Sequence, residues 1–207
     1  MGEMDKNNGK RLDEEYIRGI RFSIDLVDVL KEKFGSEISN IANSIVSVKE
    51  RQHWVQVEPQ KLTDTYIQKT QFTINLLDTL KKQYGSGITE VVNDLVEKEE
   101  RRHWTNIAQQ EESHTIEDFI HLLWDPLPSI GFEFTVEQQE DGTQMGCSHC
   151  PIYDLAKAIG GAEWLYLIEC GRDFHNVSAF NPKIGFRRTR TLMEGHDCCD
   201  HFYFMKD

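Results

Sequence analysis

The first half of the chain contains an internal repeat in which equivalent residues lie 50 positions apart. Tyr16-Ile17 matches Tyr66-Ile67, and the alignment runs without a gap until the segment Glu50 to Trp54 meets Glu100 to Trp104. A register kept over that length indicates a duplicated supersecondary unit. We therefore expect residues 1–62 to hold the first copy as an N-terminal hairpin. Residues 63–207 are then an α+β domain that includes the second copy.

Each copy has the pattern of a helical hairpin. In the first copy, Ile17, Ile20 and Ile24 recur at the spacing of one helix face. Gly35 follows a lysine-rich turn, which is typical of a helix end, and Ser36 is a residue type that often begins the next helix. Gly85 stands at the equivalent place in the second copy. The chain is therefore expected to start with two consecutive helical hairpins.

After Gln110 the pattern changes to short strands and helices. Apolar residues alternate with polar ones from Phe132 to Val136, and Asp141-Gly142 is typical of a hairpin turn. The further elements expected are a strand over 144–147, helices over 151–159 and 163–180, and strands over 186–193 and 201–204. These elements predict an α+β fold, with a small, mostly antiparallel sheet and packed helices, preceded by the duplicated helical hairpin.

Charge and hydropathy exclude several classes of function. The formal net charge is −12, whereas a nucleic-acid surface needs a basic footprint. No apolar run approaches the ~18 residues of a membrane-spanning helix. Residues 1–15 are polar and lack the apolar segment of a signal peptide. We expect a cytoplasmic protein that binds neither nucleic acid nor membrane, with reduced thiols.

Reactive side chains concentrate near the C-terminus. All five cysteines and four of the eight histidines lie between residues 147 and 201. Cysteine and histidine act as nucleophile, base or metal ligand near neutral pH. Cys198 and Cys199 are adjacent, so on a strand they would point to opposite faces, which argues against a closed four-cysteine zinc site. Cys150 precedes a helix that begins at Pro151, and the helix dipole there would favour a thiolate.

Several C-terminal motifs taken together resemble the L-2-amino-thiazoline-4-carboxylic acid hydrolase family. The similarity is dense over residues 146–205 and extends more loosely back to about residue 64. The motifs that carry it are Cys150-Pro151, Cys170-x-Arg172-Asp173-Phe174, Phe180-Asn181-Pro182, the stretch from Arg188 to Gly195, and Cys199-Asp200.

This resemblance implies hydrolytic ring opening of a cyclic amidine that carries a carboxylate, with a carbamoyl amino acid as product. The catalytic residues that it implies are Cys150, Cys170, Asp173, His196 and Cys199. Asp173 would hold the amidinium, Cys150 or Cys199 would attack as thiolate, and His196 would shuttle protons.

The substrate-binding residues that the resemblance implies are Arg172, Arg190, Thr191 and Glu194. Arg172, or one of Arg188 and Arg190, would bind the substrate carboxylate. The reaction would need either no cofactor or a divalent metal such as zinc, whose ligands would come from Cys150, Cys170, His196 and Cys199.

Two other interpretations fit the same residues. A non-catalytic module that binds or senses a small molecule or a metal would use the same cysteine and histidine pocket. A structural zinc site is the third interpretation. In each case the helical repeats offer a surface through which the chain could form a homo-oligomer.

Overall fold

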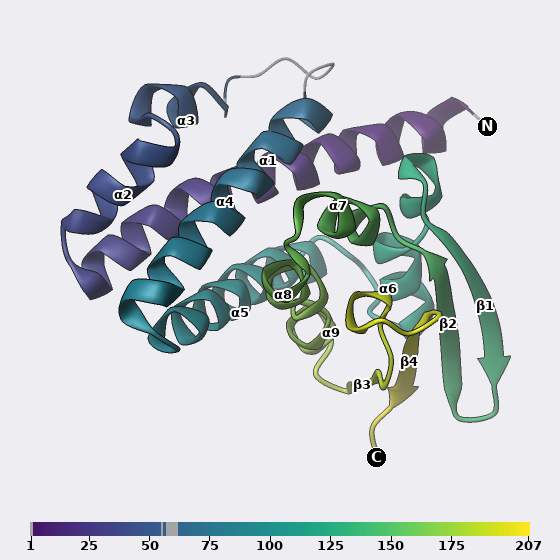
Figure 1. Cartoon of the computed structure of the whole chain (residues 1–207). Helices are drawn as coiled ribbons and strands as arrows, with labels where there is room; N and C mark the ends of the chain where they lie inside the picture. Colours follow the sequence, from purple (N-terminus) through teal and green to yellow (C-terminus); the bar gives the residue numbers. More distant parts are fainter. Residues whose placement is uncertain (1, 55, 57–61) are drawn as a thin grey trace. The chain divides into compact units, whose positions relative to one another are not determined.

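The computed structural model describes residues 2–54, 56 and 62–207 (Figure 1). The chain divides into two compact units, residues 1–92 and 93–207. The boundary between these units lies later in the chain than the domain boundary expected after residue 62. That the chain has separate folding domains with a boundary after residue 62 stays a prediction. Among the described residues, no helix is long and apolar enough to cross a membrane.

The first unit is helical. Its elements are α1 (Gly2–Phe34), α2 (Glu37–Ile45), α3 (Val48–Trp54), α4 (Leu62–Tyr84) and the start of α5 (Gly87–Ala108). Gly35 and Gly85 follow α1 and α4 with φ of 102° and 71°, a left-handed conformation that glycine adopts without strain. Ser36 stands at the N-cap position of α2, as expected, but its side chain makes no capping hydrogen bond. Superposition of the two hairpins stays a prediction.

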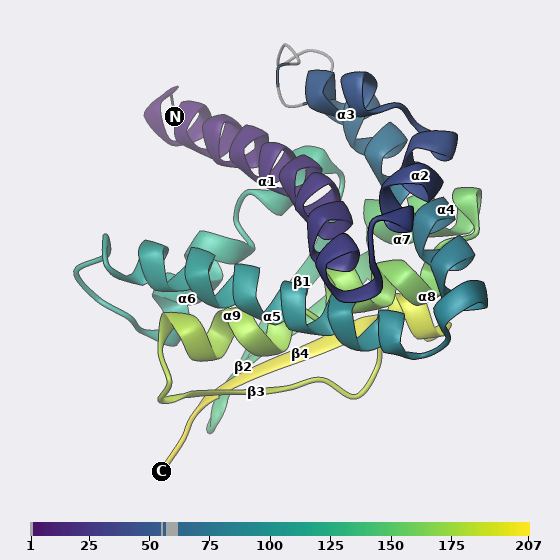
Figure 2. The same ribbon diagram turned by 90° about the vertical axis from the view of Figure 1, so that its left-hand side faces the viewer.

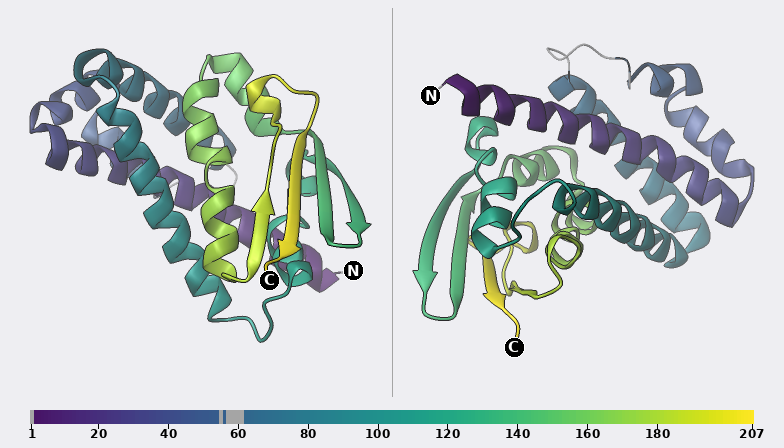
Figure 3. Two further views of the ribbon diagram at one scale, coloured as in Figure 1. Left: turned by 90° about the horizontal axis from the view of Figure 1, so that it is seen from below. Right: turned by 180° about the vertical axis from the view of Figure 1, so that it is seen from behind.

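Equivalent residues of the two repeat copies meet in this unit. The rings of Tyr16 and Tyr66 lie 5.1 Å apart, and Thr73 Oγ1 donates to Ser23 Oγ at 2.8 Å. These pairs are 50 residues apart, and so are Phe34 and Tyr84, whose rings lie 4.9 Å apart. Three such contacts at successive levels mean that α1 and α4 run parallel and in register, as the right-hand view of Figure 3 shows.

The second unit holds the rest of α5 and a mixed α+β arrangement. Its strands are β1 (Glu133–Gln139), β2 (Gly142–His149), β3 (Ile184–Arg187) and β4 (Cys199–Met205). In the described residues they form one antiparallel sheet with the order β1-β2-β4-β3. Its helical segments are α6 (Ile116–Leu123), η2 (Leu127–Ile130), α7 (Pro151–Ile159), α8 (Ala162–Leu165), η3 (Tyr166–Cys170), α9 (Asp173–Phe180) and η4 (Leu192–Glu194). The predicted α+β fold class is confirmed.

Helices α5, α6 and α9 lie over one face of the sheet (Figure 2). Trp104 from α5, Phe119 from α6 and Phe180 from α9 pack together there, with ring centroids 5.0 to 6.0 Å apart. Tyr203 of β4 packs into this core from the side of the sheet, and its hydroxyl accepts a hydrogen bond from the Trp124 indole at 3.1 Å. Burial of these large rings is the main source of stability for the unit.

Two predicted elements differ from the structure. The helix expected over 163–180 is interrupted by η3, a turn of π-helix at Tyr166–Cys170, before α9 begins. The strand expected over 186–193 ends at Arg187. Beyond it, the carboxylate of Asp200 accepts the backbone N–H groups of Thr189 and Arg190 at 2.9 and 2.6 Å, so these groups are not available to a sheet ladder.

Candidate functional site

Strand β4 presents two reactive side chains to the helix-covered face of the sheet. Residues two apart on a strand share a face, so Cys199 and His201 point the same way as the core residue Tyr203. Cys147 lies directly across from Cys199 on β2. Asp200 lies between Cys199 and His201 and faces the other way, toward the Thr189–Arg190 backbone. Because side chains alternate along the strand, Cys199 and His201 lie on one face of the sheet and Asp200 lies on the other.

Asp173 joins β4 and the segment after β3 to the start of α9. Its Oδ2 accepts a hydrogen bond from Arg188 Nη1 and lies 3.2 Å from Nε2 of His201, which donates to it. The Arg188 side chain is only 2% exposed and that of His201 8%. Arg188 Nη1 also donates to the carbonyl oxygen of Cys170 at 2.9 Å. A single carboxylate thus fixes two buried cationic side chains, near the place where α9 lies beside β3 (Figure 3, left).

Two nitrogen atoms of this cluster lack partners. Arg188 Nη2 and His201 Nδ1 are buried, and neither makes a hydrogen bond to a described residue. The phenol of Tyr166 interacts with Arg188 and helps to raise its pKa, but it does not satisfy Nη2. Buried polar groups in proteins are nearly always hydrogen-bonded, so unsatisfied ones call for an explanation. Here both nitrogens belong to side chains that are held by Asp173.

Cys199 has the electrostatic surroundings of a reactive thiol. Hydrogen bonding from the Cys147 thiol lowers its pKa most, which outweighs the opposing effect of burial. The backbone N–H of Leu192 also donates to Cys199 Sγ, at 3.2 Å. The charges of His201 and Arg188 lower the pKa further. Each of these groups stabilises the thiolate, which is the nucleophilic form of cysteine.

Cys150 and Cys170 are in less favourable surroundings for a thiolate. Cys150 directly precedes α7, as expected, but burial raises its pKa to about 11 although the N–H groups of Tyr153 and Ile152 oppose that shift. Burial also raises the pKa of Cys170, and the nearby carboxylate of Asp173 raises it further. The sequence favoured Cys150 over Cys199 as the activated thiol. The structure reverses this order because desolvation outweighs the helix dipole at Cys150.

The structure brings together four of the five predicted catalytic residues. Cys170 lies close enough to Asp173, Cys150 and Cys199 for each to affect its pKa. His196 is separate from this group. Its side chain is exposed, in the loop between η4 and β4, and makes no hydrogen bond to a described residue. His201 lies on the same face of β4 as Cys199 and is close enough to affect its pKa. The role of His196 stays a prediction.

The predicted substrate-binding residues are occupied by contacts within the protein. Nε and Nη2 of Arg172 bind Oε1 of Glu100 at 3.0 and 2.9 Å, and Nη1 binds Glu169 at 3.0 Å. Arg172 therefore holds α9 against α5. The substrate-binding roles of Arg172, Arg190, Thr191 and Glu194 stay predictions.

Arg190 and the Thr191–Glu194 turn lie closer to the surface. Arg190 is 47% exposed and forms long ion pairs with Asp197 and Asp200, at 3.5 and 3.8 Å. Thr191 and Glu194 satisfy each other, because the Glu194 N–H donates to Thr191 Oγ1, which donates in turn to the Glu194 carboxylate. These contacts shape η4 and place the Leu192 N–H that reaches Cys199.

Arg188, His201 and Cys147 are the site residues that were not assigned a leading role from the sequence. The spacing of Cys199 and His201 already predicts a shared strand face. The importance of Arg188 had no comparable signal, because its burial depends on contacts with Asp173 and Cys170. Among the described residues, no three histidine, cysteine, aspartate or glutamate side chains are arranged to hold a metal ion.

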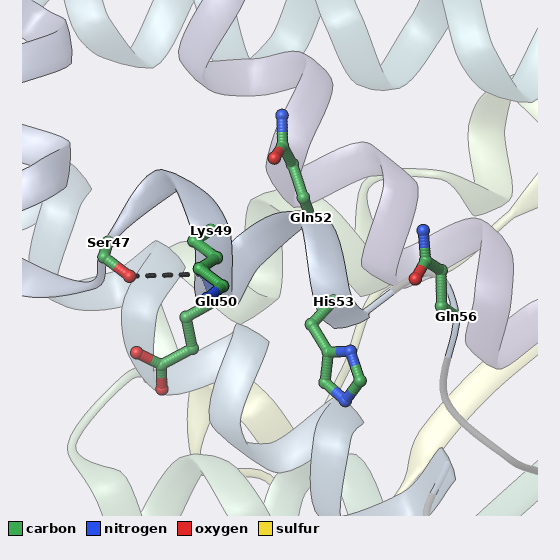
Figure 4. A pocket seen from close by; sticks show the side chains of 6 residues that line it. All are labelled: Ser47, Lys49, Glu50, Gln52, His53 and Gln56. Atoms are coloured by element: carbon green, nitrogen blue, oxygen red, sulfur yellow. Dashed lines mark hydrogen bonds between the residues drawn. The ribbon is translucent and has the colours of Figure 1, made fainter.

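A separate hollow lies in the first unit, beside α3 (Figure 4). It has a volume of about 470 Å³ and is lined by Ser47, Lys49, Glu50, Gln52, His53 and Gln56. Within it the Glu50 N–H donates to Ser47 Oγ at 3.3 Å, which begins α3. Figure 4 shows the lining side chains pointing in different directions without converging on one point. This hollow contains no arrangement of nucleophile and base.

Comparison with known proteins supports the resemblance drawn from the C-terminal motifs. The family model described as L-2-amino-thiazoline-4-carboxylic acid hydrolase matches residues 65–203, which run from α4 to β4 and include the whole Cys199, His201 and Asp173 cluster. No curated protein matches the chain, and no solved structure matches it. Because the match covers well over half of the sequence, the chain belongs to the L-2-amino-thiazoline-4-carboxylic acid hydrolase family.

Proposed function

We propose that the protein hydrolyses a cyclic amidine of the 2-amino-thiazoline-4-carboxylate type to a carbamoyl amino acid, with Cys199 as nucleophile. The observation that carries this proposal is the side-by-side placement of Cys199 and His201 on β4, with the imidazole held by Asp173. A nucleophile, a base and a group that orients the base are the recurring parts of covalent hydrolysis.

Each of the three residues has a distinct role. The Cys199 thiolate is favoured by the Leu192 N–H and the Cys147 thiol. His201 binds Asp173 through Nε2, which leaves Nδ1 to move protons. Asp173 fixes the orientation of the imidazole through its hydrogen bond to Nε2.

The reaction follows from these roles in two steps. First, the Cys199 thiolate forms a bond to the amidine carbon, and the ring C–S or C–N bond breaks as the leaving atom takes a proton from His201. The ring is then open and its carbon is attached to the enzyme. Second, water attacks that carbon and gives a proton to His201, and the Cys199 thiolate leaves. The net change is the uptake of one water molecule.

The test is turnover of 2-amino-thiazoline-4-carboxylate, followed by mass spectrometry of the product. We expect a product heavier than the substrate by one water molecule. Cys199→Ser should reduce the rate to background. Cys198→Ser should retain it, because Cys198 lies in the bend before β4, where burial and the carboxylate of Asp197 raise its pKa. Brief reaction with substrate followed by acid quenching should leave the wild-type peptide that contains Cys199 heavier by the mass of the ring-opened adduct.

Three results would reject this mechanism. Equal rates for Cys199→Ser and wild type would exclude a Cys199 nucleophile. Adduct formation on Cys150 would move the nucleophile to the start of α7. Binding of the compound without turnover would favour the non-catalytic binding module, which would use the same buried donors without the covalent step.

A further inference from the structure

We propose that the buried guanidinium of Arg188 is the anchor for the substrate carboxylate, and that the site therefore selects small zwitterions that carry a carboxylate beside a cyclic amidinium. This inference rests on the proposed function for the identity of the reacting ring. It goes beyond that function by choosing Arg188 from the three arginines that the resemblance left open for binding the carboxylate.

The first argument is that the two terminal nitrogens of Arg188 differ in their hydrogen bonds. Nη1 is fully used, because it donates both to Asp173 and to the Cys170 carbonyl oxygen. Nη2 is buried and has no hydrogen-bond acceptor among the described residues. An unsatisfied donor in a side chain that is 98% buried is costly, so a ligand that supplies an acceptor there gains the hydrogen bond and removes the penalty.

The second argument is that Arg188 cannot move away to find another partner. Its guanidinium carbon lies 5.2 Å from the ring centre of Phe174 and 5.8 Å from that of Tyr166. These two rings restrict the guanidinium plane, while Asp173 fixes one edge of it. A preorganised guanidinium binds carboxylate at a small cost in conformational entropy.

The third argument is the charge balance of the cluster. Arg188 and Asp173 form a buried ion pair of opposite charges, so together they add no net charge to the site. A neutral, largely buried site accommodates a zwitterion without adding net charge, whereas a purely anionic or cationic ligand leaves one charge uncompensated. The carboxylate would bind Arg188, and the amidinium would lie against the Cys199 thiolate.

The remaining arginines of this region differ from Arg188 in a way that favours this choice. Arg172 already binds the carboxylates of Glu100 and Glu169. Arg190 is about half exposed and pairs with aspartates at the surface, where water screens the interaction. Arg187, the neighbour of Arg188, has its guanidinium carbon 4.8 Å from the ring centre of Phe202, a residue of the opposite face of the sheet.

The test compares three ring compounds with four forms of the full chain. The compounds are 2-amino-thiazoline-4-carboxylate, the same ring without its carboxylate, and the same carboxylate ring without its amino group. The proteins are wild type, Arg188→Lys, Arg188→Gln and the matched control Arg187→Gln. Calorimetry measures binding of all three compounds, and turnover is measured separately as kcat/KM.

Wild type should prefer the complete zwitterion over the compound without carboxylate by at least about tenfold in binding, the value expected for one charge-assisted hydrogen bond. Arg188→Gln should remove this preference, Arg188→Lys should keep part of it, and Arg187→Gln should keep all of it. The loss should fall on the carboxylated ligand, so the ratio between the two ligands reports recognition even where a variant is destabilised.

Failure of this inference is distinguishable from failure of the proposed reaction. Turnover with an unchanged carboxylate preference in Arg188→Gln would overturn the role of Arg188 and leave the hydrolase in place. Carboxylate-dependent binding without any turnover would support Arg188 and reject the hydrolase. If the Arg188 variants do not fold, equal binding by wild type of the compounds with and without the carboxylate would overturn the proposal. A strong preference of wild type for the carboxylated compound, kept by Arg187→Gln, would uphold it.

Discussion

The electrostatic difference between Cys199 and Cys150 can be measured as the pH dependence of alkylation. Iodoacetamide reacts with thiolate and not with thiol, so the midpoint of a rate-against-pH curve reports the pKa of each cysteine. Restricted access lowers the plateau of such a curve but does not move its midpoint. We expect the Cys199 midpoint below the value of about 8.5 for a free cysteine, and the Cys150 midpoint near 11.

The size of the effect at Cys150 follows from its pKa. At pH 7 a thiol with a pKa of about 11 is about one part in ten thousand thiolate, whereas a free cysteine is about 3% thiolate. The more basic thiolate is intrinsically more nucleophilic, with a Brønsted slope of about 0.4–0.5, which recovers about tenfold. Cys150 should therefore react about thirtyfold more slowly than a free cysteine before steric access is considered.

The assay is peptide mass spectrometry after timed labelling of the folded protein between about pH 5.5 and pH 10. Over this range a Cys150 midpoint near 11 appears as a rate that is still rising at the highest pH. Two variants identify the causes of the Cys199 shift. His201→Gln removes a positive charge, and Cys147→Ala removes the thiol that donates to Cys199, so each should raise the Cys199 midpoint. A Cys199 midpoint above that of Cys150, or one that neither variant moves, would refute the electrostatic account of the site.

Three further predictions concern the framework around the site. Glu100→Gln should lower the free energy of unfolding by about 2–3 kcal/mol, a small value for a broken buried ion pair because Arg172 keeps its bond to Glu169. The melting temperature should fall by about 5–10 °C, whereas the control Glu99→Gln should change it little. The pKa of His149 is raised by the Gly131 carbonyl and by Asp154, so its stabilising contribution is present below pH about 6.5 and is lost as pH rises through the folded pKa; His149→Gln should flatten the melting temperature across that window. Gly171→Ala should destabilise by about 1–3 kcal/mol in chemical unfolding, whereas Gly87→Ala should be tolerated, because a Cβ would lie 2.4 Å from the Leu167 carbonyl oxygen in the first case and at ordinary contact distance in the second.

The architecture of the second unit was largely predictable, because it depends on local patterns. Alternation from Phe132 to Val136 and the turn at Asp141-Gly142 specify the β1–β2 hairpin, and Pro151 marks the start of α7. The interruption of the helix over 163–180 was not predictable. A π-helical turn has no strong sequence signature, and here it is stabilised by contacts from a segment that follows later in the chain.

The site was predictable only in part, for a similar reason. Cys150, Cys170, Asp173 and Cys199 were found because they stand in recognisable motifs. His196 was predicted because it lies in a turn rich in polar residues, but turns usually face solvent, and its side chain is exposed. His201 faces the cluster because it shares a strand face with Cys199. The pKa order of the cysteines could not be read from sequence, because desolvation depends on how neighbouring elements cover each thiol.

The π-helical turn explains why Nη1 of Arg188 has two acceptors in the protein. In this turn the Gly171 N–H donates to the carbonyl of Tyr166, five residues earlier, at 2.8 Å. The helix then restarts at Asp173, so the carbonyl oxygen of Cys170 accepts from Arg188 and not from the helix. That carbonyl and the Asp173 carboxylate both bind Nη1 of Arg188. A regular helix would direct the Cys170 carbonyl to its own backbone and take one acceptor from Nη1. The irregularity therefore places a second protein acceptor on Nη1 and helps to hold the Arg188 side chain. If Nη2 binds the substrate carboxylate as proposed, Gly171→Ala should weaken carboxylate recognition as well as stability.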